Sequence, residues 1–420
     1  MTLRARRALA LTLIVAAVGC SHPPPPLPAA NTDDPEASGL WWLERALIDA
    51  VLSYRVSSGA RSGYVALIAQ EGRLIHGYTE GYQDIESETP MAMNTRFRMA
   101  SMTKPVTGVA AMILLERGLI SVDDPVSKYL PEYGAMRVAR DPATDGELET
   151  TAQAPEMTLR HLLTFASGIG GGGWGETTTI AKRNKEFSLY QGEGSLAERV
   201  ERLAGSTLYE QPGTKWRYGA ALDVMARVVE VASGQPFDVF LRENIFDPLE
   251  MNDTYFPKNL PDGVPLATLY TQDEDGDLVR SERSSFHAAE WTPGGSGLVS
   301  TAPDYMRFAL MLWNRGEYNG TRILMPQTVD RMTTPHLKSG VLQDFGIEGL
   351  GYGYSVSVVV DEDETAMPSH NGDYWWSGAH GTHFWISPKT GVVIVVLQQN
   401  ARSAHSGLPI APYLIQGLAN

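Results

Sequence analysis

Ser101 and Lys104 lie three residues apart and form the only S-x-x-K sequence in the chain. A serine hydroxyl becomes a strong nucleophile only when a base removes its proton. A lysine amine can act as that base where burial or a neighbouring cation favours its neutral form. Residues three apart lie on one face of a helix, so the two side chains meet if a helix begins here. Taken alone, the spacing fits a nucleophile with its base and a helix-capping serine with a surface lysine equally well.

The residues that flank this pair predict a strand followed by a helix. Residues 95–99 are strand-like, and apolar side chains at 106, 109, 112 and 113 then recur at helix spacing until Gly118. The pair would therefore lie at the amino terminus of the helix. The partial positive charge of such a terminus favours an alkoxide and a developing oxyanion, which strengthens the case for catalysis.

Hydrophobic periodicity places strands near both ends of the chain and helices in the middle. Two strands joined at Glu71-Gly72 are expected within residues 62–80, and further strands at 353–360, 380–387 and 391–398. Helices are expected at 195–205, 219–233, 236–245 and 302–316, with Gly234 ending the second. This order predicts an α/β lobe built from both ends of the chain, with a helical lobe inserted. The seam between two lobes is a common position for an enzyme site.

The first residues have the features of an export signal. Three arginines precede an apolar run at residues 8–18, which is too short to span a bilayer. Cys20 is the only cysteine of the chain, and its place after this run resembles the lipobox of bacterial lipoproteins, although Ala17 stands where Leu is more usual. We therefore expect a lipoprotein signal peptide at 1–19 and a lipid on Cys20. A cleaved soluble signal with a chance cysteine is the alternative.

Residues 20–38 are rich in Pro, Ala and Ser and contain four consecutive prolines, so we expect an extended tether there. The folded domain would then occupy residues 39–420. This organisation predicts an exported protein, located in the periplasm or cell envelope and anchored to a bacterial membrane by its lipid.

Composition and charge restrict the function further. The 420 residues are 43% hydrophobic and 20% charged, which is ordinary for a globular protein and excludes wholesale disorder. The formal net charge is −15, and it is near −18 without the three arginines of the leader. Such a surface repels phosphate backbones, so we expect no nucleic-acid partner.

The sequence around the S-x-x-K pair, residues 97–133, strongly resembles the serine β-lactamase and penicillin-binding superfamily. The nearest branches are the class C β-lactamases and the family VIII carboxylesterases. Further blocks agree in order at residues 157–169, 212–234 and 294–312, and in the closing strands. The resemblance covers roughly residues 45–400. It implies a β-lactamase-like α/β (α+β) fold, in which an antiparallel sheet is flanked by helices and a mostly helical lobe is inserted. The sheet lobe would take about 39–100 and 290–420, and the helical lobe about 101–289.

The resemblance also implies roles for individual residues. Tyr218 matches the family tyrosine that exchanges protons with the nucleophile and the lysine, so Ser101, Lys104 and Tyr218 are the expected catalytic residues. The alternative for Tyr218 is a core aromatic in the sequence Trp216-x-Tyr218. The expected oxyanion hole consists of the backbone N–H groups of Ser101 and Ala379.

Two departures from the lactamase pattern change the expected substrate. The lactamase motif Tyr-x-Asn ends here in Ala220, which offers no side-chain hydrogen bond to a lactam amide. The lactamase motif Lys-Thr-Gly is matched best by Trp376-Ser377-Gly378, which lacks the cation for a substrate carboxylate. Both changes resemble family VIII esterases and favour an uncharged ester. The segment His370-Asn371-Gly372 competes for the third motif.

Three functions remain in order of preference. The first is a carboxylesterase that forms an acyl-enzyme on a small-molecule ester, and the second is a β-lactamase or a peptidase of D-amino-acid or cell-wall peptides. The third is a non-catalytic lipoprotein with a retained fold. No G-x-S-x-G or H-E-x-x-H sequence occurs, so an α/β-hydrolase elbow and a zinc site at His370, His380 and His383 are disfavoured. We expect no metal or other cofactor, and a monomer or small homo-oligomer.

Overall fold

The computed structural model describes residues 42–171, 178–281, 291–337, 341–342, 348–401 and 417. The expected signal peptide, Cys20 and the tether lie outside these residues. No helix among the described residues has the length and apolar character needed to cross a membrane.

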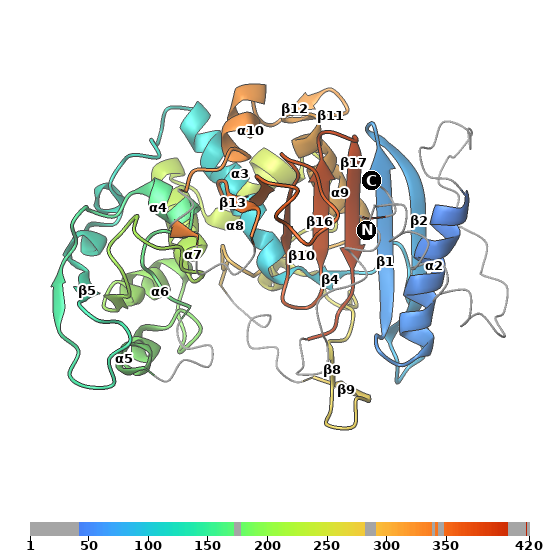
Figure 1. Cartoon of the computed structure of the whole chain (residues 1–420), viewed down its shortest axis with the longest axis horizontal. Coiled ribbons are helices and arrows are strands. Elements are labelled where there is room, and N and C mark those ends of the chain that lie inside the picture. Colours follow the sequence, from blue (N-terminus) through green and yellow to red (C-terminus); the bar gives the residue numbers. More distant parts are fainter. Residues whose placement is uncertain are drawn as a thin grey trace.

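An eight-stranded sheet forms one half of the molecule (Figure 1). Its strands come from the two ends of the chain, and every neighbouring pair is antiparallel. In sheet order they are β13 (Leu350–Tyr352), β14 (Ser357–Val359), β15 (Tyr374–Ser377), β16 (His383–Ser387), β17 (Val392–Leu397), β1 (Gly63–Gln70), β2 (Arg73–Asp84) and β3 (Thr89–Pro90). The predicted fold class, an antiparallel sheet flanked by helices with an inserted helical lobe, is confirmed.

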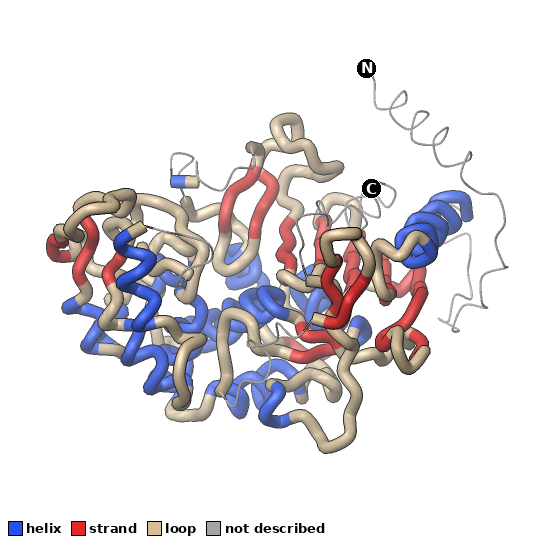
Figure 2. Tube along the Cα trace, turned by 90° about the horizontal axis from the view of Figure 1, so that it is seen from below, coloured by secondary structure: helices blue, strands red, loops and turns tan. Residues whose placement is uncertain are grey.

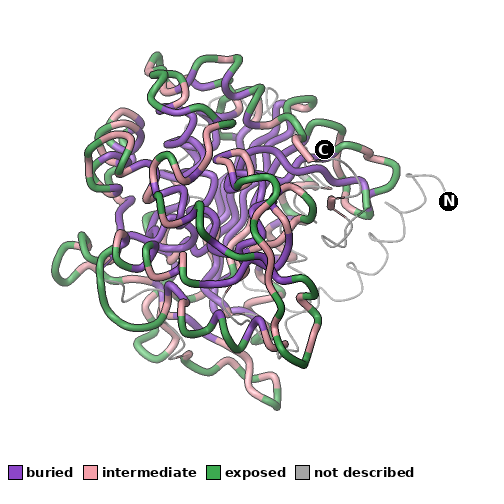
Figure 3. The backbone as a smooth tube through the Cα atoms, turned by 90° about the vertical axis from the view of Figure 1, so that its left-hand side faces the viewer, coloured by how far each residue is buried: buried purple, intermediate pink, exposed green. Residues whose placement is uncertain are grey.

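Helices cover both faces of the sheet, which explains why β1 and β17 are apolar on both sides. Alternate side chains of β1 belong to two different cores: Val65 and Leu67 join the large core, and Tyr64 and Ala66 join a smaller one. Helix α2 (Trp42–Ser57) closes the smaller core, and α9 (Ala302–Trp313) packs against β1, β16 and β17. In Figure 3 the buried residues run through the middle of the molecule and the exposed residues lie on outer loops.

Most of the remaining helices gather in the other half of the molecule (Figure 2). Helix α7 packs against α3, α4, α6 and α8 at the centre of this half. These helices are α3 (Thr103–Glu116), α4 (Leu159–Leu163), α5 (Thr179–Asn184), α6 (Leu196–Leu203), α7 (Ala221–Ser233) and α8 (Phe237–Leu241), and α8 continues into a π-helical turn at Arg242–Phe246. Helix α10 (Pro326–Met332) lies against α3.

Short strands complete the fold outside the large sheet. β4 pairs with β10 beside the amino terminus of α3, and β5 pairs with β6 and β7 in the helical half. The bounds of the short strands are β4 (Phe97–Arg98), β5 (Arg137–Ala139), β6 (Thr150–Ala152), β7 (Thr207–Leu208), β8 (Tyr270–Gln272), β9 (Leu278–Arg280), β10 (Val299–Ser300), β11 (Glu317–Tyr318) and β12 (Thr321–Arg322).

One expected strand is wrong, and the physical reason is a turn. Residues 353–360 do not form a single strand, because the chain reverses between β13 and β14, where the N–H of Gly353 donates to the carbonyl of Val356 at 3.0 Å. Ser355 has a φ of 66°, and its N–H donates to the carbonyl of Leu163 at 2.9 Å. A contact with the helical half thus fixes a turn inside an apolar run. The end of α7 at Gly234 is as expected, with a φ of 72°.

Candidate active site

Ser101 lies at a sharp turn between β4 and α3. Ala100 has a φ of 48°, a conformation that is uncommon for a residue with a side chain and is often found at functional sites. This turn leads into a short 3₁₀ helix, Ala100–Met102, which continues directly as α3. Ala100 and Met102 are buried, whereas Ser101 is half-buried. The turn therefore presents the Ser101 hydroxyl at the surface of a pocket while its neighbours anchor the backbone in the core.

Lys104 and Tyr218 both hydrogen-bond to the Ser101 hydroxyl. The Nζ of Lys104 lies 3.1 Å from Oγ, and the Tyr218 hydroxyl donates to the same oxygen at 2.6 Å. The Lys104 ammonium position is also 4.6 Å from the centre of the Tyr218 ring. The Lys104 residue is 3% exposed, so its amine is almost completely shielded from solvent. The structure thus brings together the three residues that were expected to be catalytic.

Neighbouring aromatic rings hold the Tyr218 ring in place. Phe165 packs on it with ring centres 4.9 Å apart, and the ring of Trp376 lies 5.9 Å away. The next residue, Gly219, touches the backbone of Gly170 so closely that an added Cβ would lie 2.5 Å from the Gly170 carbonyl carbon. This close approach explains why the chain has glycine after the tyrosine. The ring is thus part of the aromatic packing, as the alternative for Tyr218 supposed, while its hydroxyl points to Ser101.

A glycine pair after the helical half holds Lys104 from the other side. The Lys104 ammonium position is 2.5 Å from the carbonyl oxygen of Gly295, and Thr107 donates to the carbonyl of Gly294 at 2.6 Å. An added Cβ at Gly294 would lie 2.5 Å from the Cβ of Ala226 on α7. The segment is therefore clamped between α3 and α7, and this clamp fixes the lysine head group.

The third expected motif lies on β15 and the turn that follows it. The Ser377 hydroxyl and Nδ1 of His383 are 2.7 Å apart. A Cβ at Gly378 would collide with the carbonyl oxygen of Met99, and Thr382 donates to the same oxygen at 2.9 Å. Close packing thus joins the end of β15 to the turn that carries Ser101.

The competing segment at 370–372 lies elsewhere. Nδ1 of His370 is 3.0 Å from the Glu362 carboxylate, and the backbone N–H of Asn371 donates to that carboxylate at 3.1 Å. Neither residue lines the pocket. Of the two candidate motifs, only Trp376-Ser377-Gly378 borders the cavity beside Ser101.

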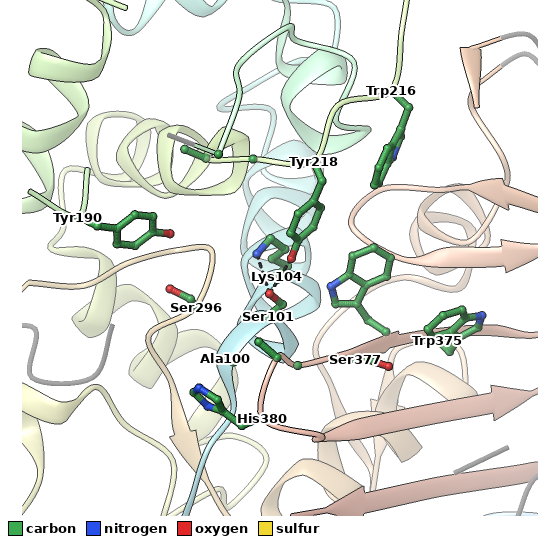
Figure 4. Close-up of a pocket in the computed structure, with 16 residues that line it drawn as sticks. Ala100, Ser101, Lys104, Tyr190, Trp216, Tyr218, Ser296, Trp375, Ser377 and His380 are labelled. Atoms are coloured by element: carbon green, nitrogen blue, oxygen red, sulfur yellow. Dashed lines mark hydrogen bonds between the residues drawn. The ribbon is translucent and has the colours of Figure 1, made fainter. Parts of the chain in front are cut away.

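The pocket around Ser101 has a volume of about 570 Å³. Figure 4 shows Tyr190, Ser296 and His380 on one side of Ser101, and Trp216 and Trp375 on the other. The cavity is therefore polar on one flank and aromatic on the other. Its lining residues are Ala100, Ser101, Lys104, Gly171, Tyr190, Trp216, Tyr218, Gly219, Ala220, Ser296, Trp375, Trp376, Ser377, Gly378, Ala379 and His380.

The pocket offers little positive charge to a substrate. Burial, followed by the charge of Arg98, lowers the pKa of His380 to about 4, so this imidazole is neutral at pH 7. Among the described residues that line the cavity, Lys104 is the only Lys, Arg, Asp or Glu. No group of three or more His, Cys, Asp or Glu side chains suited to a metal ion occurs within the described parts of the chain.

Sequence reasoning missed Tyr190, Ser296 and His380 as pocket residues. Ser296 lies in the block at 294–312 that carried the family resemblance, so its position was available as a signal. His380 directly follows Ala379, the expected oxyanion residue, so its position was also available as a signal. Tyr190 belongs to no pattern recognised in the sequence, and only the packing of distant segments brings it to the pocket.

Comparisons with known proteins extend over most of the chain. The family model described as Beta-lactamase matches residues 48–418. Protein Rv1367c of Mycobacterium tuberculosis is 32% identical over 354 residues, which cover 82% of this chain and 87% of that protein. Esterase EstB of Burkholderia gladioli is 28% identical over 385 residues, covering 86% and 92%. The solved structure of EstCE1, a hydrolase with promiscuous acyltransferase activity, matches with a TM-score of 0.74 at 26% identity, covering 90% of this chain and 98% of that one.

Proposed function

This chain belongs to the beta-lactamase family, as its sequence indicated, and from that membership we propose that it is a serine hydrolase of the carboxylesterase type. The observation that carries the proposal is the contact of both Lys104 and Tyr218 with the Ser101 hydroxyl, at 3.1 Å and 2.6 Å. A nucleophile with a base in hydrogen-bond reach, itself held by a third group, is the arrangement that covalent catalysis requires. The named relatives Esterase EstB and EstCE1 support ester substrates.

In the proposed cycle, the Ser101 hydroxyl gives its proton to the Lys104 amine, and its oxygen attacks the ester carbonyl carbon. The backbone N–H groups of Ser101 and Ala379 would stabilise the oxyanion that forms. Collapse of this intermediate breaks the C–O bond to the alcohol, which leaves with a proton from Tyr218 or Lys104. Water then attacks the acyl carbon, its proton passes to the same groups, and release of the acid restores Ser101.

Two residues favour an uncharged ester over an anionic lactam or peptide. Ala220 lines the pocket where the lactamase pattern has an asparagine, so no side-chain amide is offered there. Trp376 replaces the lysine of that pattern, and its indole N–H is a neutral donor with no partner among the described groups. A substrate carboxylate would therefore enter a cavity without a second cation to balance its desolvation.

We expect the full-length chain, solubilised in detergent, to hydrolyse nitrophenyl butyrate with a kcat/KM at least about tenfold above that for nitrocefin, a chromogenic lactam. The reason is the loss of the amide and carboxylate contacts at Ala220 and Trp376. Initial rates with both compounds, measured on one preparation, test the ranking.

If nitrocefin were turned over faster than the ester, the chain would be assigned to lactam hydrolysis instead. The same assay with an added short alcohol separates two fates of the acyl-enzyme. Free acid alone reports hydrolysis, whereas a new ester reports acyl transfer, the second activity named for EstCE1.

For location, we propose an exported protein anchored in the bacterial cell envelope by a lipid on Cys20. The basic and apolar leader with its single cysteine supports this proposal. Replacing Cys20→Ser in the producing bacterium should move the protein from the membrane fraction to the soluble fraction, because the lipid would have no attachment atom. Fractionation followed by immunoblotting measures the shift, and a serine variant that stays with the membranes would contradict the anchor.

A further inference from the structure

Asp223 is a buried acid that the proposed chemistry does not yet use. It lies in the first turn of α7, five residues after Tyr218, and its side chain is fully excluded from solvent. A carboxylate near a helix amino terminus gains from the helix dipole, but that gain does not require burial. A fully buried acid is rare unless it is paired, so the surroundings of this side chain indicate its role.

Gly295 connects Asp223 to Lys104. Its N–H donates to Oδ1 of Asp223 at 3.0 Å, and its carbonyl oxygen accepts from Nζ of Lys104 at 2.5 Å. A Cβ at Gly295 would lie 2.7 Å from Oδ2 of Asp223, so the backbone and the carboxylate are in direct contact. The orientation of this one glycine thus depends on the carboxylate on one side and fixes the lysine on the other.

The burial of Asp223 lowers the stability of the folded state at neutral pH. Burial raises the pKa of Asp223 to about 6, and the charge of Lys104 and the N–H of Gly295 oppose that rise. Because the folded pKa lies above the unfolded value of 3.8, the associated stability is present below about pH 4 and is lost as the pH rises through about 6. Oδ2 also has no hydrogen-bond partner among the described groups. A residue that lowers stability at neutral pH is a candidate for a functional role.

We propose that Asp223 is a positioning residue for Lys104, which it orients through Gly295 and whose ammonium form it stabilises after the lysine takes the Ser101 proton. The proposal rests on the acyl-enzyme function given above. It assigns Asp223 the task that an orienting carboxylate performs for the base in a catalytic triad, here through one glycine instead of a direct hydrogen bond.

Other titratable groups that face Asp223 do not compete for this task. The titratable groups that face Asp223 are Lys104 on α3, Tyr133 in the 3₁₀ turn Pro131–Ala135, and Tyr190 in the segment before α6. Burial raises the pKa of both phenols well above its usual value, so they stay neutral across the working range. Among the described groups that act on Asp223, Lys104 is the one whose charge changes in the reaction.

The test is the pH profile of the full-length Asp223→Asn variant with nitrophenyl butyrate. Asparagine keeps an oxygen for the Gly295 N–H but removes the negative charge. Without that charge the lysine is a weaker base, so the acid limb of kcat/KM should move about one pH unit lower, and the plateau should fall about tenfold. The melting temperature of the variant relative to the parent should rise between about pH 4 and pH 6 and stay level above that, because only the parent loses stability as its buried acid ionises.

Asp304→Asn is the matched control, since Asp304 is a buried acid with a raised pKa that accepts the N–H of Asp253 at 2.8 Å, away from the pocket. Its acid limb should stay in place. An acid limb in Asp223→Asn that stays or moves to higher pH, or a plateau equal to that of the parent, overturns the proposal.

Asp223→Ser is a second neutral variant and should shift the limb in the same direction. If both neutral variants fail to fold while Asp223→Glu folds, the carboxylate is a structural group and the proposal falls. Ser101→Ala in the same assay separates this outcome from failure of the proposed function. Turnover by the Ser101→Ala variant would show that the reaction needs no acyl-enzyme on Ser101, whatever the Asp223 variants do.

Discussion

Ser101→Ala should lower the hydrolysis of nitrophenyl butyrate by about 10⁴-fold or more, to near the rate of the uncatalysed reaction. The substitution removes the one oxygen that both Lys104 and Tyr218 contact, so no atom is left to form the acyl-enzyme. Because Ser101 is half-buried at the pocket surface, its replacement should leave no large cavity and little change in thermal stability.

Three measurements make this prediction strict. The rate is compared with that of Ser58→Ala, an exposed serine near the end of α2, which should match the parent. Thermal unfolding followed by circular dichroism reports whether the Ser101→Ala variant is folded. Mass spectrometry of the parent after rapid quenching should find one acyl group on the peptide that contains Ser101. A folded Ser101→Ala variant with undiminished turnover would refute the mechanism.

Lys104→Ala is expected to reduce kcat by at least about two orders of magnitude, the usual loss when a general base is removed. The amine is buried, lies 3.1 Å from the Ser101 oxygen and is held by Gly295, so no other described side chain can replace it at that position. Lys104→Met fills nearly the same volume without a basic atom, so it separates loss of the base from loss of packing.

The two variants and a surface control define the outcome. Lys104→Met should be nearly as slow as Lys104→Ala but more stable to heat, while Lys182→Ala, at an exposed position of α5, should match the parent in both respects. Partial recovery of Lys104→Ala by an added small primary amine would identify the missing group as the base. Full activity in Lys104→Met would assign the base to Tyr218 instead.

The local parts of the site were predictable because they depend on the spacing of near neighbours. Ser101 and Lys104 face each other through one helical turn, and the apolar period after them marks that helix. Periodicity failed at 353–360, where the run covers the turn that follows β13 and then β14. The left-handed backbone of Ser355 is fixed by Leu163, almost two hundred residues earlier in the chain, and no local pattern contains that contact.

Contacts between distant segments required the folded structure. Tyr218 reaches Ser101 across 117 positions of the chain, and only its family resemblance suggested the meeting. The bond from Lys104 to Gly295 spans 191 positions, and that from Gly295 to Asp223 spans 72. Asp223 in particular looks like one more polar residue of an amphipathic helix until its burial is known.

The sequence by itself determined the helix that carries the nucleophile and its base, and the absence of the amide and the cation that a lactam would use. These are properties of residue type and of spacing within one or two helical turns. The tertiary structure alone decided which other groups surround Ser101, since α3, α7, the Gly294-Gly295 segment and β15 meet only when the helical half packs on the sheet. Burial in that junction also gives Asp223 and His380 their shifted pKa values, because desolvation depends on the whole fold and not on local sequence.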